Sequence, residues 1–181
     1  VEVNLVNLFK PGNTIRESTL FLDREMAGYM NLMIKINGDL KDPQTLNKMV
    51  HIQKYLETIP TVNITLSIAD FIQEMHKTVM DNDISYQTIP DTRDKVNNLF
   101  TMYSMSGDPD DFESLVNYEY DAGLIIAMMH TVSTRDVVQI AGDIVDFLTT
   151  DLNIEVSEII LHSEAVDHNI EVSGLMMFLK D

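Results

Sequence analysis

The feature that most constrains this fold is a change of hydrophobic period between two neighbouring segments. In residues 29–37 every second residue is apolar: Met30, Leu32, Ile34 and Ile36. This alternation predicts a strand with one buried face. Beyond residue 43 apolar residues recur at helical spacing: Leu46, Met49, Val50 and Leu56. A strand followed directly by an amphipathic helix predicts a βα unit whose two elements share one core.

The connection between them, INGDLKDPQTLNKM (residues 36–49), raises the question of a ligand-binding loop. Asp42 and Pro43 have the chemistry of an N-cap and a first helical residue. The segment has one glycine and lacks the Gly-x-Gly-x-x-Gly and Gly-Lys-Ser/Thr patterns of phosphate loops. Asp39 and Asp42 would also repel an anion at this helix start. We therefore predict a structural joint.

Four further helix starts have the shape of a capping box, in which a side chain at each end satisfies free backbone amides. They are TIRE at 14–17, SIAD at 67–70, DTRD at 91–94 and STRD at 133–136. Apolar stripes at helical spacing follow three of them, and we interpret these stripes as core. The stripes are Ile68, Phe71, Ile72, Met75 and Val79; Val96, Leu99, Phe100 and Tyr103; and Val137, Val138, Ala141, Ile144, Val145 and Leu148.

The remaining strands are predicted from shorter signals. Residues 122–132 are apolar on both faces, which is typical of a central strand. Residues 62–65 and 168–174 are short strand candidates. Residues 154–162, IEVSEIILH, fit either an edge strand or a helical extension.

This order of elements predicts an α+β fold in which two βαβ units form a split-βαβ, ferredoxin-like sandwich with a helical insertion between them. We expect a linker and leading helix in 1–28, the first βαβ unit in 29–66, the insertion in 67–118 and the second βαβ unit in 119–181, together forming one compact domain. Loops at 81–91 and 106–111 would flank the insertion.

Charge and composition exclude several classes of function. The chain has 181 residues, of which 29 are acidic and 12 basic, giving a formal charge of −17. Nucleic-acid binding needs a basic surface, and anionic membranes would repel this chain. Without cysteine the chain has no disulfides, thiolate zinc sites or cysteine nucleophiles. No apolar run approaches the roughly 20 residues of a membrane-spanning helix.

Acidic loops invite a test for calcium binding. A calcium loop beginning at Asp81 would place Tyr86 where glycine is required, and one beginning at Asp108 would place Glu113 there. Neither segment is predicted to bind calcium.

Enzyme and metal motifs are likewise missing from the sequence. The segment from His162 to His168 holds two histidines and two acids, but its spacing matches no common zinc pattern. There is no His-Glu-x-x-His motif and no Gly-x-Ser-x-Gly elbow. We therefore predict no catalytic residue, metal ligand or cofactor. The histidines considered are His51, His76, His130, His162 and His168.

Twelve methionines are the most unusual part of the composition. Methionine is pliable, and methionine-rich surfaces suit varied hydrophobic ligands, although core filling is the more common role. Several lie close together in the chain: Met26, Met30 and Met33; Met102 and Met105; Met128 and Met129; and Met176 and Met177.

The run from residue 32 to 76, LMIKINGDLKDPQTLNKMVHIQKYLETIPTVNITLSIADFIQEMH, resembles the extracytoplasmic domain of RND-superfamily exporters, in the MMPL and hydrophobe/amphiphile branch. The family shows a strand ending in Gly-Asp, an Asp-Pro helix start, an L-x-x-I-P-G-V helix end and then S-I-A-D. The matching residues are Gly38-Asp39, Asp42-Pro43, residues 56–60 and residues 67–70. Thr61 departs from the family's glycine. Residues 8–26 and 89–94 also resemble the family's leading linker and its insertion.

This resemblance implies a porter domain on the periplasmic or external face of the membrane, within a proton-driven pump for hydrophobic or amphiphilic molecules. Its partners would be the parent's transmembrane helices and a second external domain, with a possible homo-oligomer. The proton-relay residues would lie in membrane helices, so no catalytic residue is expected here. A methionine-lined cleft between the two βαβ halves would be the substrate surface.

Two other interpretations remain open at this stage. The chain could be a self-contained, ferredoxin-like regulatory or ligand-binding domain, which would commonly pair its sheets into a dimer. It could also be a small acidic enzyme with an unrecognised carboxylate site. The enzyme interpretation lacks a coherent nucleophile, metal or phosphate constellation.

Overall fold

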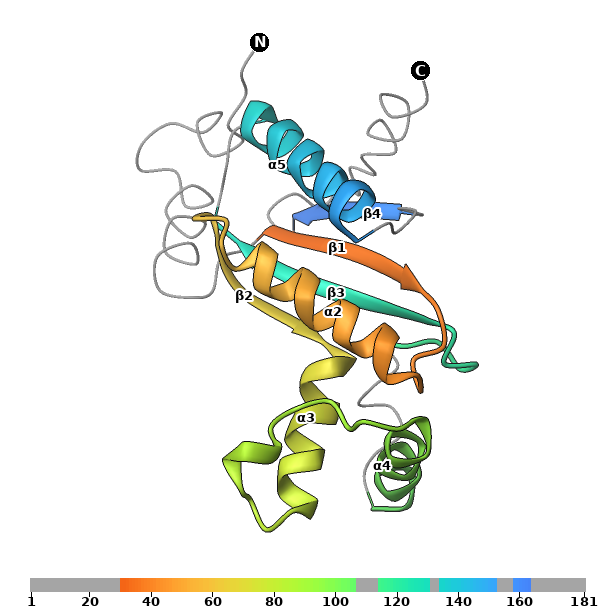
Figure 1. Cartoon of the computed structure of the whole chain (residues 1–181). Helices are drawn as coiled ribbons and strands as arrows, with labels where there is room; N and C mark the ends of the chain where they lie inside the picture. The colour runs from red at the N-terminus through yellow and green to blue at the C-terminus, as the bar shows by residue number, and fades with distance from the viewer. Residues whose placement is uncertain (1–29, 107–113, 131–133, 153–157, 164–181) are drawn as a thin grey trace. The chain divides into compact units, whose positions relative to one another are not determined.

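The computed structural model of the chain describes residues 30–106, 114–130, 134–152 and 158–163 (Figure 1). Helices and strands both contribute, so the predicted α+β class is confirmed. The elements, in order, are β1 (Met30–Asn37), α2 (Pro43–Leu56), β2 (Val62–Ser67), α3 (Ile68–Val79), the 3-10 helix η2 (Ile84–Tyr86), α4 (Arg93–Ser106), β3 (Ala122–Met129), α5 (Thr134–Asp146), the π-helical η4 (Phe147–Asp151) and β4 (Glu158–Ser163).

The strands form one sheet in the order β2-β3-β1-β4. β3 therefore lies between two strands, which confirms the central position predicted for it (Figure 1). The Gly38 amide, just after β1, donates to the Asp121 carbonyl, just before β3, at 2.8 Å. The His130 amide, after β3, donates to the Thr61 carbonyl, before β2, at 2.9 Å. β3 is thus antiparallel to both neighbours.

For residues 154–162 the sequence fits either an edge strand or a helical extension, and the structure decides between them for the C-terminal part of this segment. Residues 158–163 form β4, a strand at the edge of the sheet beside β1. Residues 154–157 lie outside the described part of the chain.

The chain divides into two compact units, each made of separate segments. Unit 1 comprises Val1–Ile34, Tyr55–Thr65 and Ile126–Asp181, and unit 2 comprises Lys35–Lys54 and Leu66–Ile125. The predicted division at residues 28, 66 and 118 stays a prediction. Its segment 29–66 holds β1, α2 and most of β2; its segment 67–118 holds α3, η2 and α4; and its segment 119–181 holds β3, α5, η4 and β4.

In unit 1 the end of α2 is tied to the end of α5. The Tyr55 ring stacks on Phe147 with ring centroids 3.9 Å apart, and its hydroxyl donates to the Asp143 carbonyl at 3.2 Å. Partial burial, together with nearby aspartates, raises the pKa of Tyr55, so its hydroxyl stays a donor. The buried apolar residues of this unit are Met30, Leu32, Ile34, Leu56, Val62, Ala127, Met129, Ala141, Ile144 and Leu148.

In unit 2 the buried residues follow the predicted stripes. Ile68 and Ile72 of α3 and the first three stripe residues of α4 are buried, which confirms those faces. Phe71, Met75 and Tyr103 are half-buried, and Val79, where α3 ends, is exposed. The buried apolar residues of this unit are Ile36, Leu40, Leu46, Met49, Ile52, Ile68, Ala69, Ile72, Val96, Leu99, Phe100, Leu115 and Ile125.

Two of the predicted helix starts are confirmed. α2 begins at Pro43, and the Asp42 carboxylate accepts a hydrogen bond from the Gln44 amide at 2.9 Å. α3 begins after Ser67 with a complete capping box that involves Asp70. In both cases a short polar side chain satisfies amides that have no partner within the helix.

The start predicted at residues 91–94 was wrong by one residue. Thr92 caps α4: its carbonyl accepts from the Val96 amide at 3.2 Å, and its hydroxyl accepts from the Lys95 amide at 3.4 Å. The Asp91 carboxylate instead contacts the Lys95 ammonium at 2.6 Å. The Asp91 carboxylate thus forms an ion pair, and the Thr92 hydroxyl caps the helix in its place.

Thr61 needs no glycine at its position. Its φ is not positive, since the non-glycine residues with positive φ in the described chain are Asp81, Asn82 and Tyr120. A β-branched residue therefore fits the backbone. The Thr61 hydroxyl is buried and has no hydrogen-bond partner, which costs some local stability.

Several predictions lie outside the described residues. They are the leading segment 1–28 with its helix start at 14–17, the cap at Ser133, the loop residues 107–111 and the strand at 168–174. Within the described residues, no helix is both long enough and apolar enough to cross a bilayer.

Candidate functional site

Unit 2 contains a pocket of about 280 Å³ beside the start of β3. The residues that line it are Lys35, Ser114, Leu115, Val116, Asn117, Ala122, Gly123 and Leu124. This volume is near the lower limit of the roughly 300–1,000 Å³ typical of small-molecule sites. The pocket can hold a compact apolar group.

A hairpin forms most of the pocket. The Leu124 amide donates to the Leu115 carbonyl at 2.8 Å, and Val116 pairs with Gly123 in an antiparallel bridge. The Asn117 amide donates to the Ala122 carbonyl at 3.1 Å. Residues 114–117 therefore run back along the beginning of β3.

The turn of this hairpin is organised by the Asn117 side chain. Its carbonyl oxygen accepts from the Asp121 and Ala122 amides, both at 3.0 Å. Its amide nitrogen donates to the carboxylates of Asp121 and Glu119. Tyr120 adopts φ 57° within the turn. Because these bonds fix Asn117, it shapes the pocket and has little capacity left to bind a ligand.

Gly123 is required where the hairpin meets the core. A Cβ atom at this position would lie 3.1 Å from a Leu40 methyl group and 3.3 Å from the Leu115 carbonyl oxygen. Since the carbonyl belongs to the backbone, any side chain here would push the hairpin away from β3. The shape of the pocket thus depends on this glycine.

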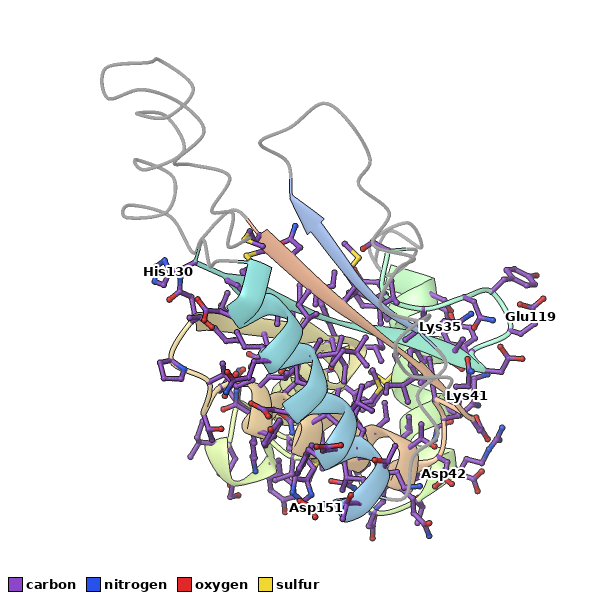
Figure 2. All side chains as sticks on the ribbon, turned by 90° about the horizontal axis from the view of Figure 1, so that it is seen from above. Lys35, Lys41, Asp42, Glu119, His130 and Asp151 are labelled. Atoms are coloured by element: carbon purple, nitrogen blue, oxygen red, sulfur yellow. The ribbon has the colours of Figure 1, made fainter. Side chains whose placement is uncertain are left out.

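Lys35 supplies the positive charge at the pocket. It lies on β1 at an exposed position of the strand's alternating pattern, as Figure 2 shows together with Glu119 on the hairpin turn. In the part of the chain that the structure describes, Lys35 has no ion pair. Its ammonium is the one charged group among the lining residues. An apolar lining with one cation suits an apolar molecule that carries an anionic group.

The β1–α2 joint packs against the same hairpin. The Leu40 amide donates to the Tyr120 carbonyl at 2.9 Å, and the Lys41 ammonium lies 5.0 Å from the centroid of the Tyr120 ring. Gly38 has φ 150°, a conformation that favours glycine. These contacts agree with the structural joint predicted for residues 36–49.

Asp39 in this joint is engaged by a neighbouring helix. Its carboxylate accepts from the Arg93 guanidinium at 2.8 Å and from the Lys41 amide at 2.9 Å. The hydrogen bond from Arg93, followed by that from Lys41, lowers the pKa of Asp39. The ion pair between Asp39 and Arg93 thus links the joint to α4.

The described histidines lie on different elements. His51 is exposed on α2, His76 contacts the Thr88 carbonyl from α3, and His130 lies 3.5 Å from the Asn63 amide group. His162 lies in β4, and His168 is outside the described residues. The described residues contain no group of three or more potential metal-ligating side chains.

The acidic segment that begins at Asp81 forms a turn followed by η2. The Asp83 carboxylate accepts from the Ser85 amide at 2.9 Å, so it acts as a cap. The second acidic segment, at 108–119, is only partly described.

The methionines have different surroundings. Met30 and Met129 are buried, whereas Met102 and Met105 are exposed on α4. Met33 and Met128 are half-buried, and Met26, Met176 and Met177 are outside the described residues. No methionine lines the pocket described above. The methionine-lined cleft stays a prediction.

Sequence reasoning missed this pocket because it assigned residues 114–118 to the helical insertion. A signal was present. Residues 117–121, Asn-Tyr-Glu-Tyr-Asp, lie between the apolar pair Leu115-Val116 and the next apolar strand, and asparagine and aspartate are typical of turns.

Comparison with protein-family models, with curated proteins and with solved structures found no match in any of the three.

Proposed function

We propose that this chain is an extracytoplasmic domain of an RND-type exporter of the MMPL and hydrophobe/amphiphile branch, and that it forms part of the path for hydrophobic or amphiphilic molecules. The resemblance rests on the order of its structural motifs. Asp42-Pro43 opens α2, Pro60 lies between α2 and β2, and residues 67–70 open α3. These positions support a shared arrangement of strand and helix ends.

The finer fold that we propose is the split-βαβ, ferredoxin-like arrangement. It is supported by the strand order β2-β3-β1-β4, with α2 between β1 and β2 and with α5 between β3 and β4. In such a fold the two βαβ crossovers interleave, so that the strands of each crossover are separated by a strand of the other. The stretch from α3 to α4 would then be the helical insertion.

The observation that carries the functional proposal is the pocket of unit 2. Its lining is apolar apart from Lys35, Ser114 and Asn117, and the ammonium is its one charge. In our proposal Leu115 and Leu124 contact the apolar part of an amphiphile, and Lys35 pairs with its anionic head. In a chain of net charge −17 a positive group at this place would discriminate among ligands.

A binding experiment with two matched probes tests this assignment. The chain is titrated with a short-chain fatty acid and with the corresponding alcohol, which lacks the charge. Lys35→Gln should weaken binding of the acid by up to roughly fivefold, because one exposed ion pair is lost, and should leave binding of the alcohol unchanged. Leu124→Asp should weaken binding of both probes.

Lys48→Gln is the matched control, because Lys48 is an exposed lysine on α2 away from the pocket lining. The assignment fails if the two lysine variants lose affinity equally, or if ligand-induced NMR shifts avoid residues 114–124.

The membrane context needs a separate test. An antibody raised against this chain should detect a large polypeptide that partitions with membranes and needs detergent for extraction. A water-soluble product near 20.6 kDa would contradict the exporter proposal, while leaving the ligand pocket intact.

A second candidate is a ferredoxin-like regulatory or ligand-binding domain that dimerises through its sheet. Ile64 favours it, because this residue is 51% exposed on β2, a strand at the edge of the sheet. An apolar side chain on an edge strand is a common pairing surface. A stable dimer that Ile64→Lys converts to a monomer would support this candidate.

A further inference from the structure

The segment from the last residue of α3 to the end of η2, residues 79–86, exposes apolar side chains; we name it the α3 tip. Val79 is 44% exposed, Met80 38%, Ile84 71% and Tyr86 38%. Four exposed apolar residues thus lie within eight positions of the sequence. Exposed apolar surface of this kind marks an interaction site more often than single exposed residues do.

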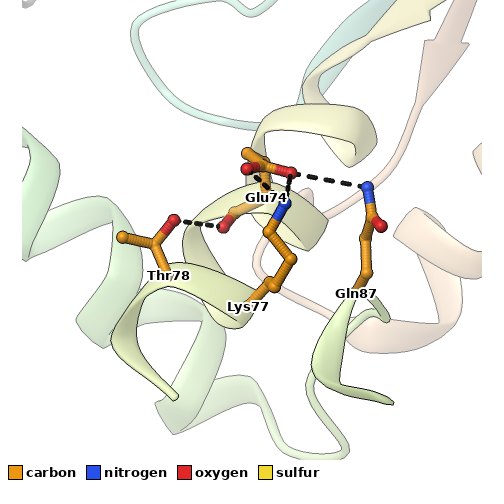
Figure 3. A network of polar contacts seen from close by, with 4 residues as sticks. All are labelled: Glu74, Lys77, Thr78 and Gln87. Carbon is orange, nitrogen blue, oxygen red and sulfur yellow. Dashed lines mark hydrogen bonds and ion pairs between the residues drawn. The ribbon is translucent and has the colours of Figure 1, made fainter. Parts of the chain in front are cut away.

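Polar contacts hold the tip against α3. The Lys77 ammonium contacts both carboxylate oxygens of Glu74 at 2.6 Å, and the Gln87 side chain donates to the same carboxylate at 3.4 Å (Figure 3). His76 Nδ1 lies 2.8 Å from the Thr88 carbonyl oxygen. The polar groups therefore bind within the unit, while apolar side chains of the tip remain exposed.

The backbone of the tip is also fixed in an uncommon conformation. Asp81 and Asn82 have φ of 58° and 59°, in the left-handed region. The Asn82 amide donates to the Lys77 carbonyl at 3.0 Å, and the Asp83 amide donates to the Met80 carbonyl at 3.1 Å. Aspartate and asparagine are the non-glycine residues that adopt this conformation most readily. The tip thus has a defined backbone turn that these hydrogen bonds hold.

The negative charge of the tip limits which kinds of partner can bind to it. The side chains of Asp81 and Asp83 are exposed beside Ile84, and neither forms an ion pair with a described basic residue. Contact with the same tip of a second copy, or with an anionic lipid surface, would bring like charges together. A surface with apolar side chains and cations would complement both features.

We propose that the α3 tip docks onto a separate polypeptide surface that presents apolar side chains flanked by lysine or arginine. Ile84 is the central anchor, with Met80 and Val79 beside it, and Asp81 contributes charge pairing. This proposal does not depend on the exporter assignment, because it rests on a different surface from the pocket.

The test uses the full 181-residue chain and two synthetic peptides. One peptide carries leucine and isoleucine flanked by lysines; the other has glutamates in place of the lysines. Titration followed by amide NMR shifts should give saturable changes at residues 79–88 with the lysine peptide and none with the glutamate peptide. Equal binding of both peptides, binding of neither, or shifts centred elsewhere would overturn the proposal.

Variants then separate apolar from charged contributions. Ile84→Glu should weaken binding at least roughly tenfold, since a buried isoleucine contact is lost. Asp81→Asn keeps a residue that tolerates the left-handed backbone and should weaken binding by up to roughly fivefold. Tyr118→Glu is the matched control, because Tyr118 is 95% exposed outside the tip, and it should bind like the parent chain.

The tip could instead be covered by a second copy or by another part of the same chain, and each case would give a different experimental result. Concentration-dependent dimerisation that Ile84→Glu abolishes would show that a second copy covers the tip. A change of the Val79 and Ile84 amide shifts on deletion of residues 164–181 or 1–29 would show that the chain covers its own tip. Either result would contradict docking to a separate polypeptide.

Discussion

At the start of α3 polar side chains are buried and hydrogen-bonded, whereas at its end apolar side chains are exposed. At its start, Ser67 and Gln53 are buried, and each polar group has a partner: Ser67 Oγ donates to Gln53 Oε1 at 2.8 Å, and Gln53 Nε2 donates to Asp70 at 2.7 Å. At its end, Ile84 and Met80 are apolar and exposed. The first end therefore contributes to stability, and the second can be changed without loss of the fold.

Among the polar contacts of α3, the largest effect is expected from Asp70→Ala. The Asp70 carboxylate accepts from both the Ser67 amide and the Gln53 side chain, each at 2.7 Å. Its removal takes away the acceptor of two hydrogen bonds at a buried helix start and should lower the free energy of unfolding by about 3 kcal/mol. Urea denaturation gives this quantity. Glu74→Ala, an exposed carboxylate of the same helix, should cost less than about 1 kcal/mol; equal losses would refute the contrast.

Gln53→Leu should have the next largest effect. Leucine fills a similar space, but the buried Ser67 hydroxyl loses its acceptor while the capping box remains. We expect a loss of about 2 kcal/mol in the free energy of unfolding. Gln44→Leu, at an exposed position of α2, is the control and should change stability by less than about 0.5 kcal/mol. An unchanged midpoint for Gln53→Leu would mean that this network is dispensable.

Ile84→Ser should leave stability almost unchanged, within about 0.5 kcal/mol, because the side chain is 71% exposed. Thermal and urea midpoints measure this directly. Ile72→Ser, in α3, is the contrasting variant. Because Ile72 is fully buried, this substitution should lower the free energy of unfolding by about 3 kcal/mol or more. A large loss from Ile84→Ser would show that the tip is part of the core.

The smallest effect concerns pH at the tip. The Ser85 backbone amide, and then its hydroxyl, hydrogen-bond the Asp83 carboxylate and lower the pKa of that group. A lowered pKa stabilises the folded state above the ordinary aspartate range, and this contribution is lost as the pH falls through the lowered value. The Ser85 amide NMR shift should therefore move only in acid, below the ordinary range. Asp83→Asn should remove this transition; a transition at or above the ordinary range would disprove the assignment.

Local chemistry explains why some elements could be predicted. The alternation of β1, the Asp42 cap and the Ser67–Asp70 capping box depend on residues within a few positions of one another. The misplacement at α4 has a local cause as well. Asp91 and Thr92 could each cap the helix, and only the ion pair to Lys95 decides between them.

The buried polar network at the start of α3 and the candidate site both depend on contacts that no short window of sequence contains. Gln53 reaches Ser67 across 14 positions of sequence and Asp70 across 17. The pocket likewise needs Lys35 from β1 beside a hairpin that lies about 80 residues later. Sequence reasoning had no rule that pairs residues over such separations, so it assigned the hairpin to the helical insertion.

The sequence by itself determined where β1, α2 and α3 begin, which faces of these elements are buried, and that the chain combines both kinds of element. These properties follow from side-chain periodicity and from caps that act within one turn. Tertiary structure decided that residues 158–163 form an edge strand, that Asn117 closes a hairpin, and that Ile84 stays outside the core. The physical reason is that strand pairing and burial depend on which distant segment provides the partner, and local sequence does not encode that choice.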